Sequence, residues 1–144
     1  MLWTVVMKVR DIMNPEPVTA CESDALGHAH RLMKTCHIRH LPVVSDGQLI
    51  GIVSERDILA ARARAEGDDQ WWKLPVRAAM TAPVHSATPD DSLAAVAARL
   101  ATSKIGALPV LDHGRLVGIV SVTDVLDAEA RQAATLPTRT GYAR

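Results

Sequence analysis

The sequence predicts an α/β fold, of the mixed α+β kind, built from two copies of one β-α-β-β-α unit. The first observation is a nine-residue stretch that occurs twice, at residues 51–59 and 118–126, with an offset of 67. The second is that each further predicted element has a counterpart at about the same offset. The third is composition, since 48% of the residues are hydrophobic and Phe is absent, so the core is aliphatic. A fixed period indicates tandem repeats that bury their cores only by stacking.

Each unit is expected to begin with a short edge strand. Residues 9–13 match residues 76–80, and both segments lead into a proline-containing turn. Proline fixes φ and removes a backbone donor, so it fits the entry to an edge strand. We therefore expect strands at residues 17–19 and 83–85.

A helix is predicted next in each unit. Pro89 and Ser92 supply start signals in the second copy, and Asp24 is a plausible cap in the first. The positions i, i+3, i+4 and i+7 carry Leu93, Val96, Ala97 and Leu100 in the second copy, and Leu26, Ala29, His30 and Met33 in the first.

A hairpin and a second helix are predicted to complete each unit. An Asp-Gly or His-Gly pair between two apolar runs is typical of a hairpin turn. A helix is expected to start at the serine that ends the second run, Ser54 or Ser121. The first strands are expected at residues 38–44 and 105–111, the turns at 45–47 and 112–114, and the second strands at 49–53 and 116–120.

The boundaries follow from the two copies. We expect an N-terminal extension at residues 1–8, units at 9–65 and 76–132, a linker at 66–75 and a flexible tail at 133–144. Either Met1 or Met7 fits the start of the chain. Trp71 and Trp72 are expected to pin the linker against the body, and a role in binding a partner stays open.

These motifs carry a resemblance to a known family. The proline-led entries, the two Leu-Pro-Val strands and the two Gly-Ile-Val-Ser-x-x-Asp stretches resemble the CBS domain, and two in tandem resemble a Bateman module. The resemblance covers residues 9–132. It implies two β-α-β-β-α repeats related by pseudo-two-fold symmetry with their sheets packed together. It also implies clefts that bind adenine nucleotides such as AMP, ADP or ATP, and a homodimer of two such pairs.

The Ser-x-x-Asp stretches admit two interpretations. A serine and an aspartate three residues apart at a helix start form a capping box, which stabilises the helix by about 1 kcal/mol. The free N–H groups at a helix N-terminus also suit a phosphate. In proteins that resemble this one, the aspartate takes the ribose hydroxyls and the serine or threonine reaches ribose or phosphate.

The resemblance implies two ligand sites, which we predict to be unequal. Arg39 and His40 precede one Leu-Pro-Val strand, whereas Gly106 and Ala107 precede the other, and by analogy the basic pair reaches the phosphate of a ligand on Asp124. We therefore expect the Asp124 site to bind phosphorylated ligands more tightly. The Asp124 site comprises Ser121, Thr123, Asp124, Val84, Ile105, Pro109, Val120, Arg39 and His40. The Asp57 site comprises Ser54, Arg56, Asp57, Val18, Ile38, Pro42, Val53 and Lys104.

Several function classes are disfavoured. The 16 basic and 16 acidic residues balance, which argues against nucleic acid held by a basic face. No apolar run approaches the roughly 18 residues of a membrane span. Two cysteines do not form a disulfide framework, so a cytoplasmic location is expected. No catalytic set is recognisable, and we expect no metal at His28 and His30, which point about 200° apart on a helix.

The leading hypothesis is a stand-alone regulatory module rather than an enzyme. It requires no cofactor, takes an adenine nucleotide as regulatory ligand with or without Mg²⁺, and signals to an unknown protein by a conformational or assembly change. The alternative is a structural or protein-interaction module with vestigial clefts that bind no nucleotide. An enzyme is the third reading, supported only by the histidine cluster.

Overall fold

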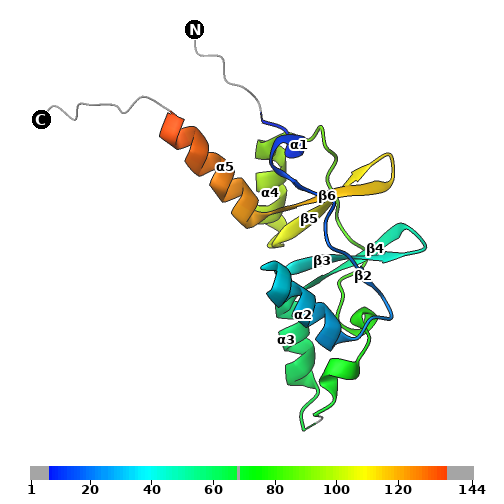
Figure 1. The fold of residues 1–144 in the computed structure, drawn as a ribbon. Coiled ribbons are helices and arrows are strands. Elements are labelled where there is room, and N and C mark those ends of the chain that lie inside the picture. The colour runs from blue at the N-terminus through cyan, green and yellow to red at the C-terminus, as the bar shows by residue number, and fades with distance from the viewer. Residues whose placement is uncertain (1–6, 68, 136–144) are drawn as a thin grey trace, which may run out of the picture.

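The protein folds into two stacked α/β units, each with one three-stranded sheet (Figure 1). The computed structural model describes residues 7–67 and 69–135. The two sheets meet through contacts between β4 and β6. The longer helices of both units lie on one side of the molecule, and the hairpin turns lie on the other.

The first unit follows the predicted β-α-β-β-α order. Its sheet has the strand order β2-β3-β4, with β2 parallel to β3 and β3 antiparallel to β4. Leu26, Leu41 and Ile58 are fully buried between the sheet and the helices. The elements are β2 (Ala20–Cys21), α2 (Leu26–Cys36), β3 (His40–Ser45), β4 (Gln48–Ser54) and α3 (Glu55–Arg64).

The second unit contains a matching hairpin between two helices. Its sheet has the order β1-β6-β5, and Val96, Leu108 and Val120 are fully buried in its core. The predicted start of its first helix is confirmed, because the Ser92 hydroxyl accepts a hydrogen bond from the Ala95 N–H. The elements are α4 (Leu93–Ser103), β5 (Ala107–Asp112), β6 (Arg115–Ser121) and α5 (Val122–Thr135).

The segment that leads into each repeat packs on the opposite unit. Helix α1 (Val9–Ile12) and strand β1 (Asn14–Pro15) join the second unit, where Val9 is fully buried and β1 pairs antiparallel with β6. The 3₁₀ turn η2 (Val76–Ala78) joins the first unit, where Val76 is fully buried. The packing units therefore differ from the sequence repeats, because the leading segments are exchanged.

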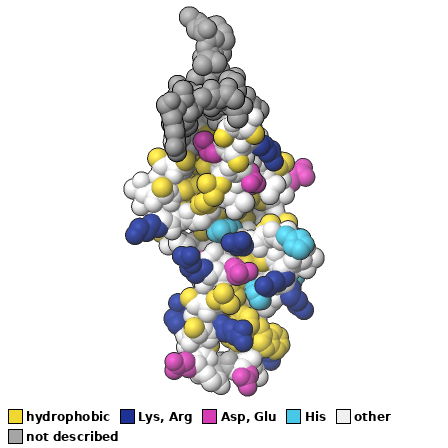
Figure 2. Space-filling view, turned by 90° about the vertical axis from the view of Figure 1, so that its left-hand side faces the viewer, with side chains coloured by type: hydrophobic (Ala, Val, Ile, Leu, Met, Phe, Trp, Pro, Cys, Tyr) yellow, Lys and Arg dark blue, Asp and Glu magenta, His cyan; other side chains and the backbone are white. Residues whose placement is uncertain are grey.

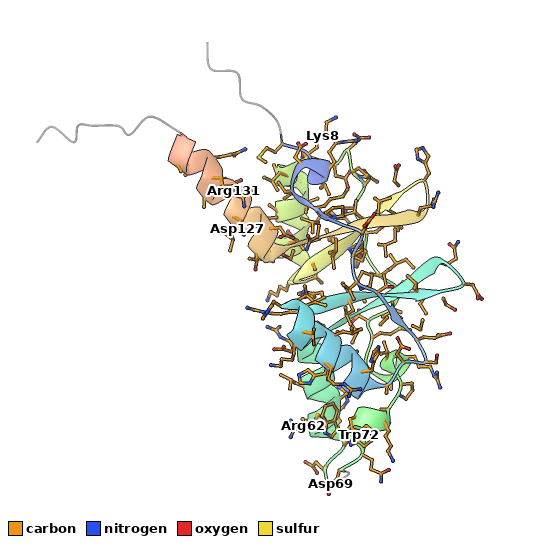
Figure 3. All side chains as sticks on the ribbon, viewed as in Figure 1. Lys8, Arg62, Asp69, Trp72, Asp127 and Arg131 are labelled. Atoms are coloured by element: carbon orange, nitrogen blue, oxygen red, sulfur yellow. The ribbon has the colours of Figure 1, made fainter. Side chains whose placement is uncertain are left out.

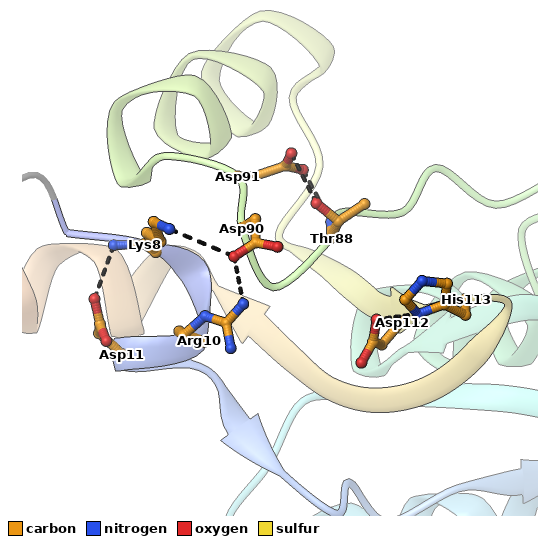
Figure 4. A network of polar contacts seen from close by, with 8 residues as sticks. All are labelled: Lys8, Arg10, Asp11, Thr88, Asp90, Asp91, Asp112 and His113. Carbon is orange, nitrogen blue, oxygen red and sulfur yellow. Dashed lines mark hydrogen bonds and ion pairs between the residues drawn. The ribbon is translucent and has the colours of Figure 1, made fainter.

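Ion pairs fasten the leading segment to the start of α4 (Figure 4). The Asp90 carboxylate contacts both the Arg10 guanidinium and, at 3.5 Å, the Lys8 ammonium. Asp11 accepts a hydrogen bond from the Lys8 N–H. The hydrogen bond from Arg10 lowers the pKa of Asp90. These side chains are exposed, so the ion pairs add little stability beside the burial of Val9.

Both predicted hairpin turns are confirmed. Asp46 and Gly47 have φ values of 49° and 75°, and His113 and Gly114 have values of 50° and 80°. Two successive residues with positive φ form the turn that matches the right-handed twist of the strands. Glycine adopts such a φ without the strain that a side chain adds.

The first strand of each unit was predicted too early, and so was one cap. Residues 17–19 and 83–85 are not strands. In the first unit pairing starts at Ala20, and in the second an isolated parallel bridge joins Ala87 to Val110. Pro17 and Pro83 have no N–H to donate to a ladder, and pairing starts three and four residues beyond them, at Ala20 and Ala87. Asp24 does not cap α2, because its carboxylate accepts the Cys21 N–H and Ala25 stands at the N-cap.

The linker packs on the first unit through one of its two tryptophans. Trp71, in the 3₁₀ turn η1 (Trp71–Lys73), packs against the core of that unit. The Arg62 guanidinium carbon lies 5.4 Å from the centre of the Trp71 ring. Trp72 remains 47% exposed, although its Cβ atom and its backbone lie against Gly27. The predicted pinning therefore holds for the Trp71 side chain, whereas about half of Trp72 remains exposed.

Candidate functional site

Both Ser-x-x-Asp stretches form capping boxes at strand-to-helix junctions. In the first, Asp57 Oδ2 accepts the Ser54 N–H at 2.9 Å, and Ser54 Oγ accepts the Asp57 N–H at 3.0 Å. In the second, Asp124 Oδ2 accepts the Ser121 N–H at 2.8 Å, and Ser121 Oγ accepts the Asp124 N–H at 3.2 Å. Oδ1 takes no part in either cap, and both aspartates are half-buried. The geometry thus combines a capped helix start with a partly accessible carboxylate.

One groove lies between the two repeats. It has a volume of about 220 Å³, and it brings together Val18, Ile38 and His40 of the first repeat with Ile119 of the second. Ile119 precedes Ser121 by two residues on β6, so the two side chains lie on one face of the strand. The groove therefore reaches β6 two residues before Ser121, and Ser121 and Asp124 are not among its lining residues. The segment from Asn14 to Val18 and the thiol-bearing Cys36 complete its lining.

A second groove runs between α1 and α5. It has a volume of about 310 Å³, and Asp124 is the one predicted site residue among its lining residues. Asp11 and Asp127 add two carboxylates, and Arg131 adds one cation (Figure 3 labels Asp127 and Arg131 on α5). The space beside Asp124 is therefore acidic on this side. The apolar part of the lining is Met7, Ile12 and Ala128.

Four of the predicted slot residues belong to the interior. The side chains of Val53 and Val120 are fully buried in the two cores, and Pro42 and Pro109 are also buried. Residues that alternate along a strand point to opposite faces, and these valines take the core face. Their predicted role in lining a slot does not fit this burial. Of the other predicted residues, Val84 and Ile105 are half-buried, and Arg39, Arg56, Lys104 and Thr123 are exposed.

His40 stands where the two repeats touch. It pairs with Ser54 across β3 and β4. A Cβ atom built on Gly106 of the other repeat would lie 2.6 Å from Nε2 of His40, so the imidazole rests directly on that glycine. The Gly106 carbonyl accepts the N–H of Val122, the first residue of α5. One histidine therefore contacts the structures that support both capping boxes.

Burial controls the charge of His40. Its pKa is lowered from the ordinary value, first because burial penalises the imidazolium form. The Asp57 carboxylate acts in the opposite direction, and Arg39 lowers the pKa further. In the absence of a further anion the ring is thus held mainly neutral near pH 7.

A sequence model of one protein family matches this chain twice. The CBS domain model matches residues 9–64 and 76–131, which together make up most of the chain. The chain belongs to the CBS domain family. The predicted family and the predicted mixed α/β fold are therefore confirmed.

Similar proteins share the paired arrangement. The CBS domain-containing protein YhcV of Bacillus subtilis is 34% identical over 117 residues, covering 81% of each chain. The CBS domain pair of protein MJ0100, in complex with 5′-methylthioadenosine and S-adenosyl-L-methionine, has a TM-score of 0.80 and 29% identity over 88% of this chain and 98% of that one. CBSX2 in complex with AMP has a TM-score of 0.74 and 26% identity, covering 88% of this chain and 98% of its own.

The CBS pair also occurs as a part of larger proteins. The L-aspartate semialdehyde sulfurtransferase of Methanocaldococcus jannaschii is 33% identical over 119 residues. The match covers 81% of this chain and 22% of that enzyme. The similarity to this enzyme is thus confined to about a fifth of its length.

Sequence reasoning missed part of the lining of both grooves. Asn14, Ile119 and Asp11 were not predicted, because the exchange of leading segments between the repeats was not foreseen. Within residues 7–67 and 69–135, no three His, Cys, Asp or Glu side chains are grouped closely enough to hold a metal ion. In the same residues, no helix has the length and apolar character that crossing a membrane requires.

Proposed function

We propose that this CBS pair is a regulatory module that binds an adenine nucleotide and signals through a change in the packing of its repeats. The observation that carries the proposal is the groove between the repeats, which runs from the apolar Val18 and Ile38 to β6, just before the Asp124 capping box. An apolar slot suits a flat base, and a carboxylate suits a ribose diol. The AMP complex of CBSX2 supports the ligand class for this chain.

In this proposal the ligand changes the packing between the two repeats, because both repeats contribute residues to its site. His40 contributes to the groove from the first repeat, and Ile119 contributes from the second. A ligand that contacts both repeats stabilises one relative position over others by its difference in affinity. A regulated protein, or a second copy of this chain, then binds preferentially to that relative position of the repeats.

We further propose unequal sites, with the Asp124 site binding phosphorylated ligands more tightly. His40 bears on this assignment because it lines the groove that reaches Ile119 on β6, two residues before Ser121, although the carboxylate that acts on its pKa is that of Asp57. A phosphate beside His40 stabilises the imidazolium form of its side chain. A phosphorylated ligand therefore binds more tightly when His40 is protonated. Asp11 and Asp127 line the groove on α5 with Asp124 and disfavour a long phosphate chain there. We therefore expect a monophosphate to be preferred over a triphosphate at this site.

Thermal unfolding with a ligand panel tests the proposed function. Each compound is added at about a hundredfold molar excess over the protein, and binding to the folded state then raises the apparent stability. The panel comprises AMP, ADP, ATP, S-adenosylmethionine and 5′-methylthioadenosine. We expect AMP to raise the unfolding temperature and inorganic phosphate to leave it unchanged. The absence of a shift with every adenosine compound would instead support the alternative of an interaction module with vestigial clefts.

A further inference from the structure

The linker leaves an apolar surface uncovered at the end of the first unit. Trp72 is 47% exposed and Leu74 is 36% exposed. Lys73 stands between them, and its Nζ atom lies 5.1 Å from the centre of the Trp72 ring. Tryptophan is enriched among the residues that contribute most to protein interfaces, so this ring is a candidate anchor for a partner. We call Trp72, Lys73 and Leu74 the linker surface.

Backbone contacts with α2 hold the linker surface in place. The Leu26 N–H donates a hydrogen bond of 2.8 Å to the Leu74 carbonyl. A Cβ atom built on Gly27 would lie 3.0 Å from Cβ and 3.3 Å from the carbonyl oxygen of Trp72, so the linker lies directly on that glycine. The matching residue of α4 is Ala94. Because the Trp72 backbone is already ordered, less conformational entropy is lost when a partner binds to its ring.

The two helices that pack beside the linker surface present only basic exposed charges. Both α2 and α3 contact η1, and both are described throughout. Figure 2 shows basic side chains spread over the half of the molecule that the first unit forms, with acidic side chains at its lower end. A surface of this sign attracts a negatively charged partner. The exposed charged residues are Arg31 and Lys34 on α2, and Arg56, Arg62 and Arg64 on α3.

Arg31 extends toward the linker surface from α2. Side chains on a helix lean toward its N-terminus, and Arg31 follows Gly27 by four positions, so its side chain covers the turn on which Trp72 lies. His30 meets the ring of Trp71 edge-on with the ring centres 6.4 Å apart, so this side of α2 faces the linker. The Arg31 guanidinium forms no ion pair with the described acidic residues, which leaves it available to a carboxylate of a partner.

We propose that the linker surface and Arg31 together dock an acidic segment of a partner protein. A large apolar side chain of the segment packs on Trp72 and Leu74, and its carboxylates pair with Arg31 and Lys73. The basic charge on α2 and α3 selects an acidic partner over a basic one. Trp72 and Arg31 line neither groove, so the docking does not require a nucleotide.

An acidic peptide fits this surface better than a negatively charged membrane does. Glu66 and Asp69 are exposed on the same linker, and Figure 3 places Asp69 at the tip of the molecule, beyond Trp72. A membrane laid across this end would bring its anionic headgroups against both carboxylates. Helix α2 runs from the linker toward the groove that Cys36 lines, so a peptide that follows α2 from Trp72 leads away from the tip.

Selection from a displayed library of random short peptides tests the proposal on the full chain without any nucleotide. We expect the enriched peptides to carry a net negative charge and at least one large apolar residue. We also expect these peptides to be lost when Trp72→Ala replaces the wild type as bait. The most enriched peptide is then synthesised with a fluorescent label, and fluorescence anisotropy measures its dissociation constant.

Two variants and two matched controls locate the binding of that peptide. Trp72→Ala and Arg31→Glu are each expected to raise the dissociation constant by roughly tenfold or more. Leu126→Ala removes an exposed apolar side chain from α5, and Arg115→Glu reverses an exposed charge on the other hairpin. Both controls are expected to stay within about twofold of the wild type. All four side chains are exposed, and urea denaturation checks that each variant folds like the wild type.

Several results would overturn the proposal. Enriched peptides that are neutral or basic would do so, and so would a selection that enriches no peptide. Equal affinity of the acidic peptide for the wild type and Trp72→Ala would place its binding elsewhere. Vesicles of phosphatidylserine and phosphatidylcholine that sediment the wild type but not Trp72→Ala would assign the linker surface to a membrane instead.

Discussion

At the scale of single residues, Asp57 and Asp124 show how a structural role and a proposed binding role share one side chain. Each uses Oδ2 to cap a helix. The cap alone explains the serine and the aspartate, so these residues by themselves do not establish a ligand site. The two copies differ in sequence around these aspartates, and Asp11 and Asp127 line one groove together with Asp124.

Gly106 is expected to be intolerant of a side chain because His40 rests on it. A Cβ at this position would lie 2.6 Å from Nε2 and 2.8 Å from Cε1 of the imidazole. Gly106→Ala is therefore expected to lower the free energy of unfolding by about 1–3 kcal/mol, the usual cost of overpacking. Urea denaturation measures the change. The double variant with His40→Ala should recover most of the loss, and equal losses in both backgrounds would contradict the contact.

His40 is also expected to make stability depend on pH. Its pKa is lowered in the folded state, chiefly by burial, so the unfolded chain binds the proton more readily. The contribution of His40 is then fully present above the unfolded pKa of about 6.5 and is lost as the pH falls through and below that value. Denaturation at pH 7.5 and 5.5 should show a smaller loss in His40→Gln than in the wild type. An identical loss in both would exclude His40 as the source.

At the scale of elements, the exchanged leading segments hold the two units together. Val9 belongs to the first repeat in sequence but is fully buried in the core of the second unit. Val9→Ala is expected to cost about 2 kcal/mol in the free energy of unfolding, because it leaves a cavity. Val76→Ala, the matched change in the other unit, should cost a similar amount. A cost below about 0.5 kcal/mol at Val9 would mean that the leading segment is not packed as described.

The elements that depend on interactions between residues close in sequence were predicted correctly. Ser92, the two capping boxes and the two hairpin turns are each specified by residues within a few positions, and all were confirmed. The first strands were misplaced, because proline marks the approach to a strand but not the residue at which pairing begins. The side of β6 on which β1 pairs depends on contacts between residues about a hundred positions apart, which no local pattern encodes.

The candidate site was predictable in its polar part only. The repeated Ser-x-x-Asp stretches predicted both strand-to-helix junctions directly. The apolar lining was assigned less well. The side chains of Val53 and Val120 face the cores, whereas Ile119, the neighbour of Val120, lines the groove. Only the packing shows which face of a strand is buried. Period-two patterns give the alternation, whereas the direction of the core comes from the tertiary fold.

At the scale of the whole molecule, duplication followed by divergence gives two similar junctions with different charges. The proposed ligand selectivity rests on the difference between Arg39 and His40 in the first repeat and Gly106 and Ala107 in the second. A ligand bound between the repeats would then act on the packing of one repeat against the other.

The inequality of the two sites is the central claim, and calorimetric titration with AMP tests it most directly. Asp57→Asn and Asp124→Asn are matched changes that keep the shape of each side chain and an oxygen for the cap. The account predicts that Asp124→Asn removes the tighter binding event while Asp57→Asn retains it. Loss of the tighter event in Asp57→Asn, with the event intact in Asp124→Asn, would contradict the account.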